Sequence, residues 1–354
     1  MTAHLRANLC LLIFTVLLCC VLYPLVLWGI AATLFHDKAQ GSLISDAQGK
    51  LLGSRLIAQP FTADEYFQPR PSAASYNAAA SSCSNWAACN YLLRDRVARQ
   101  LGPIVKYRGG SKKGQQVAPD IEDWFRKDRF DGKPGIVEQW ANAHNGVAQN
   151  WVKTNNDAVS QKLANAYTAA WHRTHEKEVK EWLHGNPGTD EPKSEDTEDQ
   201  SSLAVPFFVS YSHEHPGTFP SIVEHKAADG KTEKKVEPVK EGSDIQSAFF
   251  DMWLAAHKDA DLEPVPADMV MASGSGLDPH ITLANARWQL DQRVAGAWAK
   301  KTGGNEAQLH HEIEQLLNEQ SQAPLAGLVG VPLVNVLEIN LTLKGKYEKA
   351  AAGK

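Results

Sequence analysis

The sequence predicts an α+β protein carried on a single N-terminal transmembrane helix. Three observations lead to this fold class: an uncharged apolar run at residues 9–35, helical spacing of apolar residues along much of the remaining chain, and short strand-like segments near both ends of the polar part. The 354-residue length allows two or three domains. We expect a mixed α/β domain interrupted by a large helical, partly disordered insertion.

The apolar run reads LCLLIFTVLLCCVLYPLVLWGIAATLF and contains no charged residue. As a helix it is roughly 40 Å long, which is enough to cross a bilayer with some tilt. A cleaved signal peptide is the alternative, but the run is too long for one and no A-x-A-like site follows it. We therefore predict a retained anchor over residues 1–36, with Leu9, Pro24, Trp28 and Phe35 in the membrane span.

Charge and cysteine content narrow the function classes. The formal net charge of −5 is mild, so the composition does not indicate a nucleic-acid partner. Three of the five cysteines lie in the anchor, and the other two are Cys83 and Cys89. Their six-residue separation would allow a disulfide in an oxidising compartment, and two unrelated thiols are equally compatible with it. The spacing does not match a C-x-x-C metal or redox motif.

The segments that follow the anchor are predicted in order. Residues 41–44 and 50–59 are expected as two short strands joined by a turn at 46–49. A Ser-, Ala- and Asn-rich stretch, YFQPRPSAASYNAAASSCSNWAACN, is irregular. NYLLRDRVARQLG then resumes helical spacing, and Gly102 is a plausible stop.

The middle of the chain, residues 106–261, has the character of an insertion. Residues 120–185 indicate two or three helices whose tryptophans we interpret as a helical core rather than a ligand cage: Trp124, Trp140, Trp151, Trp171 and Trp182. The acidic stretch 185–202 is expected to be a disordered linker, 203–211 a strand, 227–242 a mobile segment, and 244–262 a helix.

Two helices and a strand are predicted near the C-terminus. Residues 282–304 have strong helical spacing that ends at Gly303, and 305–320 form a second helix capped by Asn305. Residues 334–343, VNVLEINLTL, alternate apolar and polar positions. Alternation of this kind predicts a half-buried strand.

The stretch ASGSGLDPHI is the strongest candidate for chemistry. Ser275 lacks the G-x-S-x-G spacing of a nucleophile elbow, because Ser273 stands two residues before it. Asp278 and His280 are too close in sequence for an ordinary triad. We interpret Asp278 as a helix cap with Pro279 at the first helical position, after glycines that supply backbone freedom. The alternative is a membrane-anchored serine hydrolase using Ser275 and His280.

Histidines invite a search for metal sites. His172 and His175 lie with Glu176 on one helical face, but the H-E-x-x-H pattern is absent. We favour an exposed polar face and expect no metal, with a metal-binding module around the two histidines as the alternative. The chain also contains no P-loop and no dinucleotide-binding fingerprint.

Several stretches together resemble one family, the C subunit of the Kdp-type potassium-transporting ATPase. They are the anchor with YPLVLWGIA, GSLI…GKLLGSRLIAQPF, YFQPRPSAASYNAAASSCSN, DMVMASGSGLDPHI with RVA, and VNVLEINLTL. The resemblance covers about 5–105 and 262–343; it departs at Cys83, where the family tends to have glycine, and at the insertion. The motif residues that it marks as structural or partner-contacting are Arg70, Pro71, Ser72, Tyr76, Asn77, Ser84, Asn85, Ser273, Gly274, Ser275, Gly276, Asp278, Pro279, His280 and Asn335.

The resemblance implies a non-catalytic accessory subunit of a pump in the bacterial inner membrane. Its partners would be a channel-like potassium-binding subunit and a P-type ATPase subunit, besides membrane lipid, with ATP and potassium handled by the complex. The family is described as assisting assembly and raising ATP affinity. Its soluble domain is extracytoplasmic and its N-terminus cytoplasmic, so we favour an indirect effect on ATP. The implied division is an anchor at 1–36, a core at 37–105 and 262–343, the insertion at 106–261, and a flexible tail at 344–354.

Overall fold

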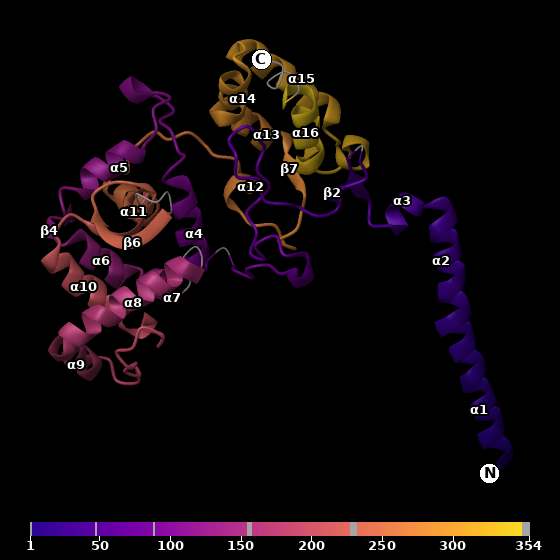
Figure 1. The fold of residues 1–354 in the computed structure, drawn as a ribbon, viewed down its shortest axis with the longest axis horizontal. Helices are drawn as coiled ribbons and strands as arrows, with labels where there is room; N and C mark the ends of the chain where they lie inside the picture. Colours follow the sequence, from indigo (N-terminus) through magenta and orange to yellow (C-terminus); the bar gives the residue numbers. More distant parts are fainter. Residues whose placement is uncertain (1, 47, 88, 154–157, 227–231, 349–354) are drawn as a thin grey trace. The chain divides into compact units, whose positions relative to one another are not determined.

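The chain folds into two compact units. The computed structural model describes residues 2–46, 48–87, 89–153, 158–226 and 232–348. Unit 1 combines the two ends of the chain, Met1–Ser84 and Pro266–Lys354, and unit 2 is the stretch between them, Asn85–Val265 (Figure 1). The insertion expected at 106–261 therefore lies in unit 2, which also takes in the helix expected at the end of the preceding core segment.

Unit 1 begins with one long helix. It is made of α1 (Thr2–Val16), the π-helical η1 (Leu17–Leu22) and α2 (Tyr23–Leu34), and the short α3 (His36–Ala39) follows. Residues His4–Leu34 are long and apolar enough to cross a membrane, and their side chains are not packed against the rest of the protein. The π-helical turn stands directly before Pro24, where the missing N–H and the ring disturb regular helix bonding.

A hairpin follows the anchor as predicted, but its second strand ends at Ser54, five residues earlier than expected. Strand β1 (Leu43–Ser45) pairs antiparallel with β2 (Leu51–Ser54). Asp46 closes the turn, because its Oδ1 accepts hydrogen bonds from the backbone N–H groups of Gln48 and Lys50. Short helical turns follow along the chain at η2 (Ala78–Ala80) and α12 (Ala267–Val270).

The C-terminal part of unit 1 is a small helical layer with a two-stranded sheet. Its elements are β7 (His280–Thr282), α13 (Leu283–Gln289), η5 (Leu290–Val294), α14 (Ala295–Thr302), α15 (Glu306–Gln320), η6 (Pro324–Gly327), β8 (Leu333–Asn335), α16 (Val336–Leu343) and η7 (Lys344–Glu348). Gly303 ends α14 in the left-handed conformation, and the Asn305 side chain caps α15 at the Gln308 N–H, both as predicted. Trp298, Ile313 and Leu317 lie in the core that these helices enclose.

The strand predicted at 334–343 is wrong. Only Leu333–Asn335 is extended, and it pairs antiparallel with β7; the residues after it form α16. The buried positions of α16 are Val336, Leu337, Ile339, Asn340 and Leu343, a three- and four-residue spacing that a helix buries on one face. The chain continues helically through η7, where Tyr347 is buried, so 344–348 are not a flexible tail; residues 349–354 lie outside the described residues.

Two buried side-chain amides hold the extended segment at Phe67 and Gln68. Asn340 accepts from the Phe67 N–H and donates to the Phe67 carbonyl, each at 2.8 Å. Gln289 does the same for Gln68, accepting at 2.7 Å and donating at 3.0 Å. Each amide therefore satisfies both backbone groups of one residue, as a neighbouring strand would.

Unit 2 is mainly helical, with two antiparallel hairpins. Its elements are α4 (Tyr91–Leu101), η3 (Gly110–Lys112), α5 (Ala118–Phe125), β3 (Arg129–Phe130), β4 (Lys133–Pro134), α6 (Ile136–Ala143), α7 (Asn145–Lys153), α8 (Ala158–Thr174), α9 (Glu176–Gly185), η4 (Ser201–Leu203), α10 (Ala204–Glu214), β5 (Phe219–Lys226), β6 (Thr232–Val239) and α11 (Ser243–Ala256). Helix α11 lies in the middle of the unit, packed against α4 and α5 (Figure 1). The predicted helices at α4 and α11 are confirmed.

The tryptophans build the core of unit 2, as predicted. The indole of Trp140 contacts the rings of Phe208, Phe219 and Phe249, with centroids 5.1, 5.4 and 5.7 Å away. Trp171 is also buried, and Trp124, Trp151 and Trp182 pack against the same core. The aromatic side chains therefore contact one another, as in a hydrophobic core.

The strand predicted at 203–211 is wrong. These residues form most of α10, which is buried on several sides. Ala204, Phe207, Phe208 and Tyr211 share one face and are all at most 2 % exposed, and Pro206, Ser210 and Ser212 on other sides of the helix are buried as well. A helix that is buried around its circumference loses the periodicity that would reveal it in the sequence.

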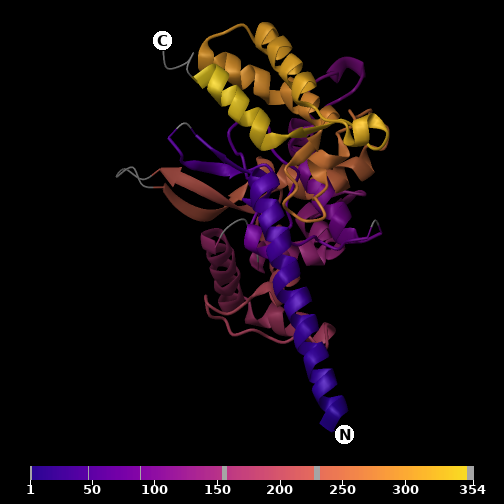
Figure 2. The same cartoon turned by 90° about the vertical axis from the view of Figure 1, so that its right-hand side faces the viewer.

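Two segments expected to lack order are structured. Residues 232–239 form β6, paired with β5 from Phe219↔Val239 to Lys226↔Thr232; Figure 2 shows the two strands side by side. Residues 227–231 lie outside the described residues. The acidic stretch 185–202 is docked on α8, where Asn165 donates to the carbonyls of Asp196 and Glu198 and Arg173 donates to that of Ser194. Gln200 at its end is fully buried.

Candidate functional site

The two most specific motif segments, residues 70–82 and 271–280, fold against one another in unit 1. The Ser273 N–H donates to the Pro71 carbonyl at 3.2 Å, and the Ser72 hydroxyl donates to the Gly276 carbonyl at 2.5 Å. The Arg70 guanidinium reaches the Ala272 carbonyl at 3.3 Å. We call this arrangement the motif crossing.

Ser72 is the centre of the motif crossing. Besides donating to Gly276, its hydroxyl oxygen accepts from the backbone N–H groups of Ala74 and Tyr76, at 3.1 and 3.0 Å. The Tyr76 hydroxyl donates back to the Arg70 carbonyl at 2.8 Å, and its burial raises the pKa of the phenol. These polar groups are saturated by the fold itself, which is the pattern of a structural turn.

Gly276 has a strict conformational role that Gly274 lacks. Its φ is +69°, and a Cβ built there would lie 2.8 Å from the Ser82 carbonyl oxygen and 2.9 Å from the Ala74 Cβ. A Cβ at Gly274 would meet no atom within 4 Å. The prediction that the glycines supply backbone freedom therefore applies to Gly276, where positive φ and close approach coincide.

Ser275 is placed as a turn residue. It is exposed, its hydroxyl oxygen accepts from the Leu277 N–H at 3.1 Å, and its carbonyl accepts from the Ser82 N–H and the Ser81 hydroxyl. Among the described residues no hydrogen bond joins Ser275 to His280. The imidazole Nδ1 of His280 lies instead 3.2 Å from Asp278 Oδ1, so a serine–histidine pair is not assembled.

The predicted helix cap at Asp278 is wrong. Strand β7 follows Pro279, and the side chain that caps the next helix is Thr282, whose hydroxyl accepts from the Asn285 N–H. Asp278 Oδ1 accepts from the His280 N–H at 3.0 Å, which closes a short turn before the strand. Hydrogen bonding from His280, with a further contribution from Arg70, lowers the pKa of Asp278.

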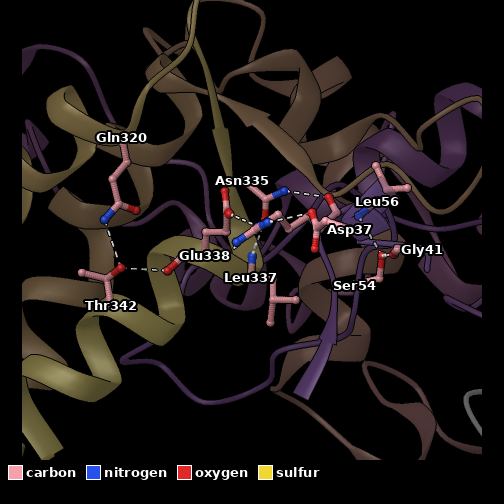
Figure 3. A network of polar contacts seen from close by, with 10 residues as sticks. Asp37, Gly41, Ser54, Leu56, Gln320, Asn335, Leu337, Glu338 and Thr342 are labelled. Atoms are coloured by element: carbon pink, nitrogen blue, oxygen red, sulfur yellow. Dashed lines mark hydrogen bonds and ion pairs between the residues drawn. The ribbon is translucent and has the colours of Figure 1, made fainter. Parts of the chain in front are cut away.

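A polar network connects the residues after the anchor to the start of α16 (Figure 3). Asn335 donates to the Arg55 carbonyl at 2.9 Å and caps α16 by accepting from the Leu337 and Glu338 N–H groups. Arg55 in turn pairs with Glu338 at 2.7 Å and with Asp37 at 3.4 Å. The motif residue Asn335 is therefore a helix cap that also fastens the β1–β2 hairpin.

Beside this network is a pocket of about 310 Å³. Leu325 and Leu333 supply part of its apolar lining, and its polar lining consists of His280, Gln320, Gln322, Asn335 and Glu338. The lining contains no lysine, no arginine and no glycine-rich loop, which are the groups that hold nucleotide phosphates. Its composition gives no support to a nucleotide site.

An uncharged loop, residues 321–332, lies next to the pocket in the chain and exposes large apolar side chains. The exposed fractions are 72 % for Leu325, 86 % for Leu328, 60 % for Val329 and 53 % for Val331. Exposed apolar residues this close together are typical of a contact surface. We call residues 324–331 the apolar loop; no motif spacing in the sequence singles it out.

The remaining motif residues, Asn77, Ser84 and Asn85, lie close together in the sequence. Asn77 caps η2, while Ser84 and Asn85 are the last residue of unit 1 and the first of unit 2. Cys83 is half-buried and Cys89 is exposed. A disulfide between them remains a prediction.

The structure does not bring His172 and His175 together as a site. His172 is 3 % exposed, with Nδ1 3.2 Å from Gln200 Oε1, so the expectation of an exposed polar face is wrong for it. His175 pairs separately with Glu214 at 2.7 Å. Nothing in these contacts supports the alternative of a shared metal module.

These observations define a class of protein: one membrane-spanning candidate helix carrying a unit whose motif segments form structural turns. A family model described as "KdpC: K+-transporting ATPase, c chain" matches residues 5–123 and 231–345. The chain belongs to this family of K+-transporting ATPase c chains. The anchor, both segments of the motif crossing and α16 all fall within the matched residues.

Curated relatives agree with the family. The chain is 48 % identical over 99 residues to the potassium-transporting ATPase KdpC subunit of Pseudomonas aeruginosa, covering 28 % of this chain and 54 % of the relative. It is 47 % identical over 110 residues to the KdpC subunit of Pseudomonas putida, covering 31 % of this chain and 60 % of the relative. It is 47 % identical over 102 residues to the KdpC subunit of Methanosphaerula palustris, covering 29 % of this chain and 55 % of the relative. The chain thus spans little more than half the length of these relatives.

Proposed function

We propose that this chain is a non-catalytic accessory subunit of an ATP-driven potassium uptake complex. The observation that carries the proposal is the family match over both the anchor and the motif crossing. Its partners are a channel-like potassium-binding subunit and a P-type ATPase subunit, and its role is to stabilise their assembly. The hydrogen-bonded hydroxyl groups of Ser72 and Ser275 support a scaffold role over catalysis.

The apolar loop is the surface that we assign to partner contact. Four large apolar side chains stand exposed there, and twelve consecutive residues, 321–332, carry no charge. Burying such side chains against an apolar partner surface contributes roughly 25 cal/mol for each Å² removed from water. The loop is also attached to β8, whose end is fastened to the residues following the anchor through Asn335 and Arg55.

The effect on ATP is indirect in this proposal. The sequence has no P-loop, and the pocket beside Glu338 has neither lysine nor arginine in its lining. We place the N-terminus in the cytoplasm and the parts of both units that follow the anchor outside it, where cytosolic ATP is out of reach. The subunit would raise ATP affinity by favouring one conformation of the ATPase subunit, because a ligand-like partner shifts an equilibrium by binding one state more tightly.

Co-purification from the native membrane tests the proposal. The tagged full-length chain should retain both partner subunits, and Leu328→Asp should weaken that retention. Val159→Asp is the matched control, because Val159 is also well exposed, at 58 %, but lies between the two family-matched segments. Equal retention by both variants would remove the apolar loop from the interface, and absence of both partners with the unmodified chain would contradict the proposed function.

Topology has its own test. A reporter that is active only in the cytoplasm, fused after Lys354, should be silent, and the same reporter at the N-terminus should be active. The opposite pattern would reverse the proposed orientation and would make direct contact with cytosolic ATP possible.

A further inference from the structure

Three side chains of metal-ligand type meet inside unit 2, away from the motif crossing. Asp95 comes from α4, His144 stands at the end of α6, and Asp251 comes from α11. His144 Nε2 lies 3.7 Å from Asp95 Oδ1 and 3.9 Å from Asp251 Oδ2. One ligand atom of each residue lies within 4.8 Å of the others, the only such group of three among the described residues.

The distances from His144 Nε2 to the two carboxylate oxygens are close to those between the ligands of one metal ion. Both distances from His144 exceed a hydrogen bond, while ligands bound to tetrahedral zinc at about 2.0–2.1 Å lie roughly 3.3 Å apart. A contraction of about half an ångström would bring both carboxylate oxygens to that distance from His144 Nε2. A cavity of about 10 Å³, close to the volume that holds one water, is lined by Asp95, Arg99, His144 and Asp251.

The imidazole is oriented as a ligand. His144 Nδ1 lies 3.2 Å from the Trp140 carbonyl oxygen, which can only accept, so Nδ1 carries the proton. Nε2 therefore presents its lone pair, or a second proton, toward the two carboxylates. A backbone carbonyl on the far nitrogen is the usual arrangement of a metal-ligating histidine.

Asp95 supplies a second, independent observation. The residue is 8 % exposed, and its Oδ2 is buried with no hydrogen-bond partner among the described residues. Burial raises the pKa of this carboxyl group. A buried carboxylate oxygen without a partner is costly, and a cation bound to both oxygens of Asp95 would satisfy Oδ2 as well as Oδ1, the oxygen nearer His144.

Neighbouring charges decide which cation fits. Arg94 donates to Asp251 Oδ1 at 3.0 Å, and the half-buried Arg99 lies close enough to Asp95 to interact with its charge. These two arginines disfavour an ion held by charge alone, such as Mg²⁺ or Ca²⁺, which also require more oxygen ligands. An imidazole with two carboxylates suits a transition ion that bonds strongly to nitrogen.

We propose that Asp95, His144 and Asp251 bind one divalent transition ion of the zinc class, joining α4, the α6–α7 junction and α11. A fourth position faces the adjoining pocket, about 630 Å³ in volume, which His144 and Asp251 also line. Asp95 and Asp251 lie within the residues that the family model matches, and His144 lies between the two matched segments, so only the histidine ligand comes from outside the match.

Metal binding by the full-length chain in detergent tests this proposal. After chelator treatment, Zn²⁺ should bind at one equivalent and raise the unfolding temperature, whereas Mg²⁺ should do neither. His144→Gln should weaken Zn²⁺ binding at least 10-fold, as expected when a ligand is lost. His175→Gln, which removes another histidine paired with a carboxylate, should leave it unchanged.

Cobalt gives a readout that needs no variant. Co²⁺ bound to the wild-type chain should show the intense visible absorption of a low-coordinate site, and Zn²⁺ should displace it. A wild-type chain that shows neither a cobalt spectrum nor a Zn²⁺-dependent shift in unfolding temperature would overturn the proposal. So would a folded His144→Gln variant that binds Zn²⁺ as tightly as His175→Gln. In either case a protonated His144 bridges the two carboxylates without a metal.

Discussion

Replacing Gly276 by alanine tests the motif crossing most directly. A side chain in the left-handed region costs about 1–2 kcal/mol. The new Cβ would also stand 2.8 Å from the Ser82 carbonyl oxygen, and overpacking of this kind costs about 1–3 kcal/mol. The two effects together destabilise unit 1 by about 2–5 kcal/mol, a large part of a typical domain stability of about 5–15 kcal/mol.

The matched control is Gly274→Ala, two residues away in the same turn. Its Cβ would meet nothing within 4 Å, so the free energy of unfolding should change by less than about 0.5 kcal/mol. Thermal unfolding of the detergent-solubilised chain measures both variants. For a unit of this size the Gly276 change corresponds to a fall of about 4–20 °C in the unfolding temperature.

Unit 2 provides an internal reference in the same experiment. Residues 70–82 and 271–280 lie in unit 1, so Gly276→Ala should move the unfolding transition of unit 1 and leave that of unit 2 in place. Equal, small shifts for Gly276→Ala and Gly274→Ala would refute the argument that positive φ and close approach make this glycine necessary.

Four further outcomes are expected. Asn340→Leu should lower the free energy of unfolding by about 2–5 kcal/mol in denaturant titrations, because it leaves a buried N–H and a buried carbonyl unpaired, and a change below 1 kcal/mol would contradict the amide-pairing role. The pKa of Asp278 is lowered in the folded state, so the ionised side chain stabilises the fold relative to Asp278→Asn. This difference in the free energy of unfolding should be complete above the unfolded pKa of about 4 and should disappear as the pH falls through the folded pKa. A difference that persists in acid would exclude this charge effect. Ser275→Ala should cost about 1 kcal/mol or less and leave assembly and potassium-stimulated ATP hydrolysis intact, whereas full assembly without activity, or labelling of Ser275 by a serine-hydrolase probe, would favour the hydrolase alternative. Cys83 and Cys89 should resist alkylation in protein purified without reductant, and labelling of both would end the disulfide prediction.

Local signals predicted the parts of the fold that depend on them. The helix stop at Gly303, the cap at Asn305 and the β1–β2 turn at Asp46 are all determined within a few residues, and the structure confirms each one. The anchor was equally readable, because a long uncharged apolar run has few alternatives.

The secondary-structure prediction is wrong where the sequence pattern does not distinguish strand alternation from helical spacing. In α16 the apolar residues fit alternation as well as the helical spacing, and the discriminating signal was Asn335, a good capping residue directly before the run. Helix α10 was misread because it is buried around its circumference, which removes the polar face that normally identifies a helix.

The candidate site beyond the motif crossing depends on contacts between distant parts of the chain. Asp95, His144 and Asp251 come from three helices, and no spacing along the sequence indicates that they meet. The cap before α13 was assigned to Asp278 instead of Thr282 because Asp–Pro is a common start for a helix, while the intervening β7 is specified by its pairing with β8, more than fifty residues later.

The amide pairs at Phe67 and Gln68 have a consequence for biosynthesis. The side chains that complete them are encoded 273 and 221 residues further along the chain. At roughly 5–20 residues per second, the ribosome supplies them roughly 10–55 s after the segment itself has been made. Throughout that interval the whole of unit 2 is being translated and can fold, because domains generally fold as units. Unit 1 therefore completes its fold last, after the anchor has already been made, and the backbone groups of Phe67 and Gln68 wait for their partners throughout.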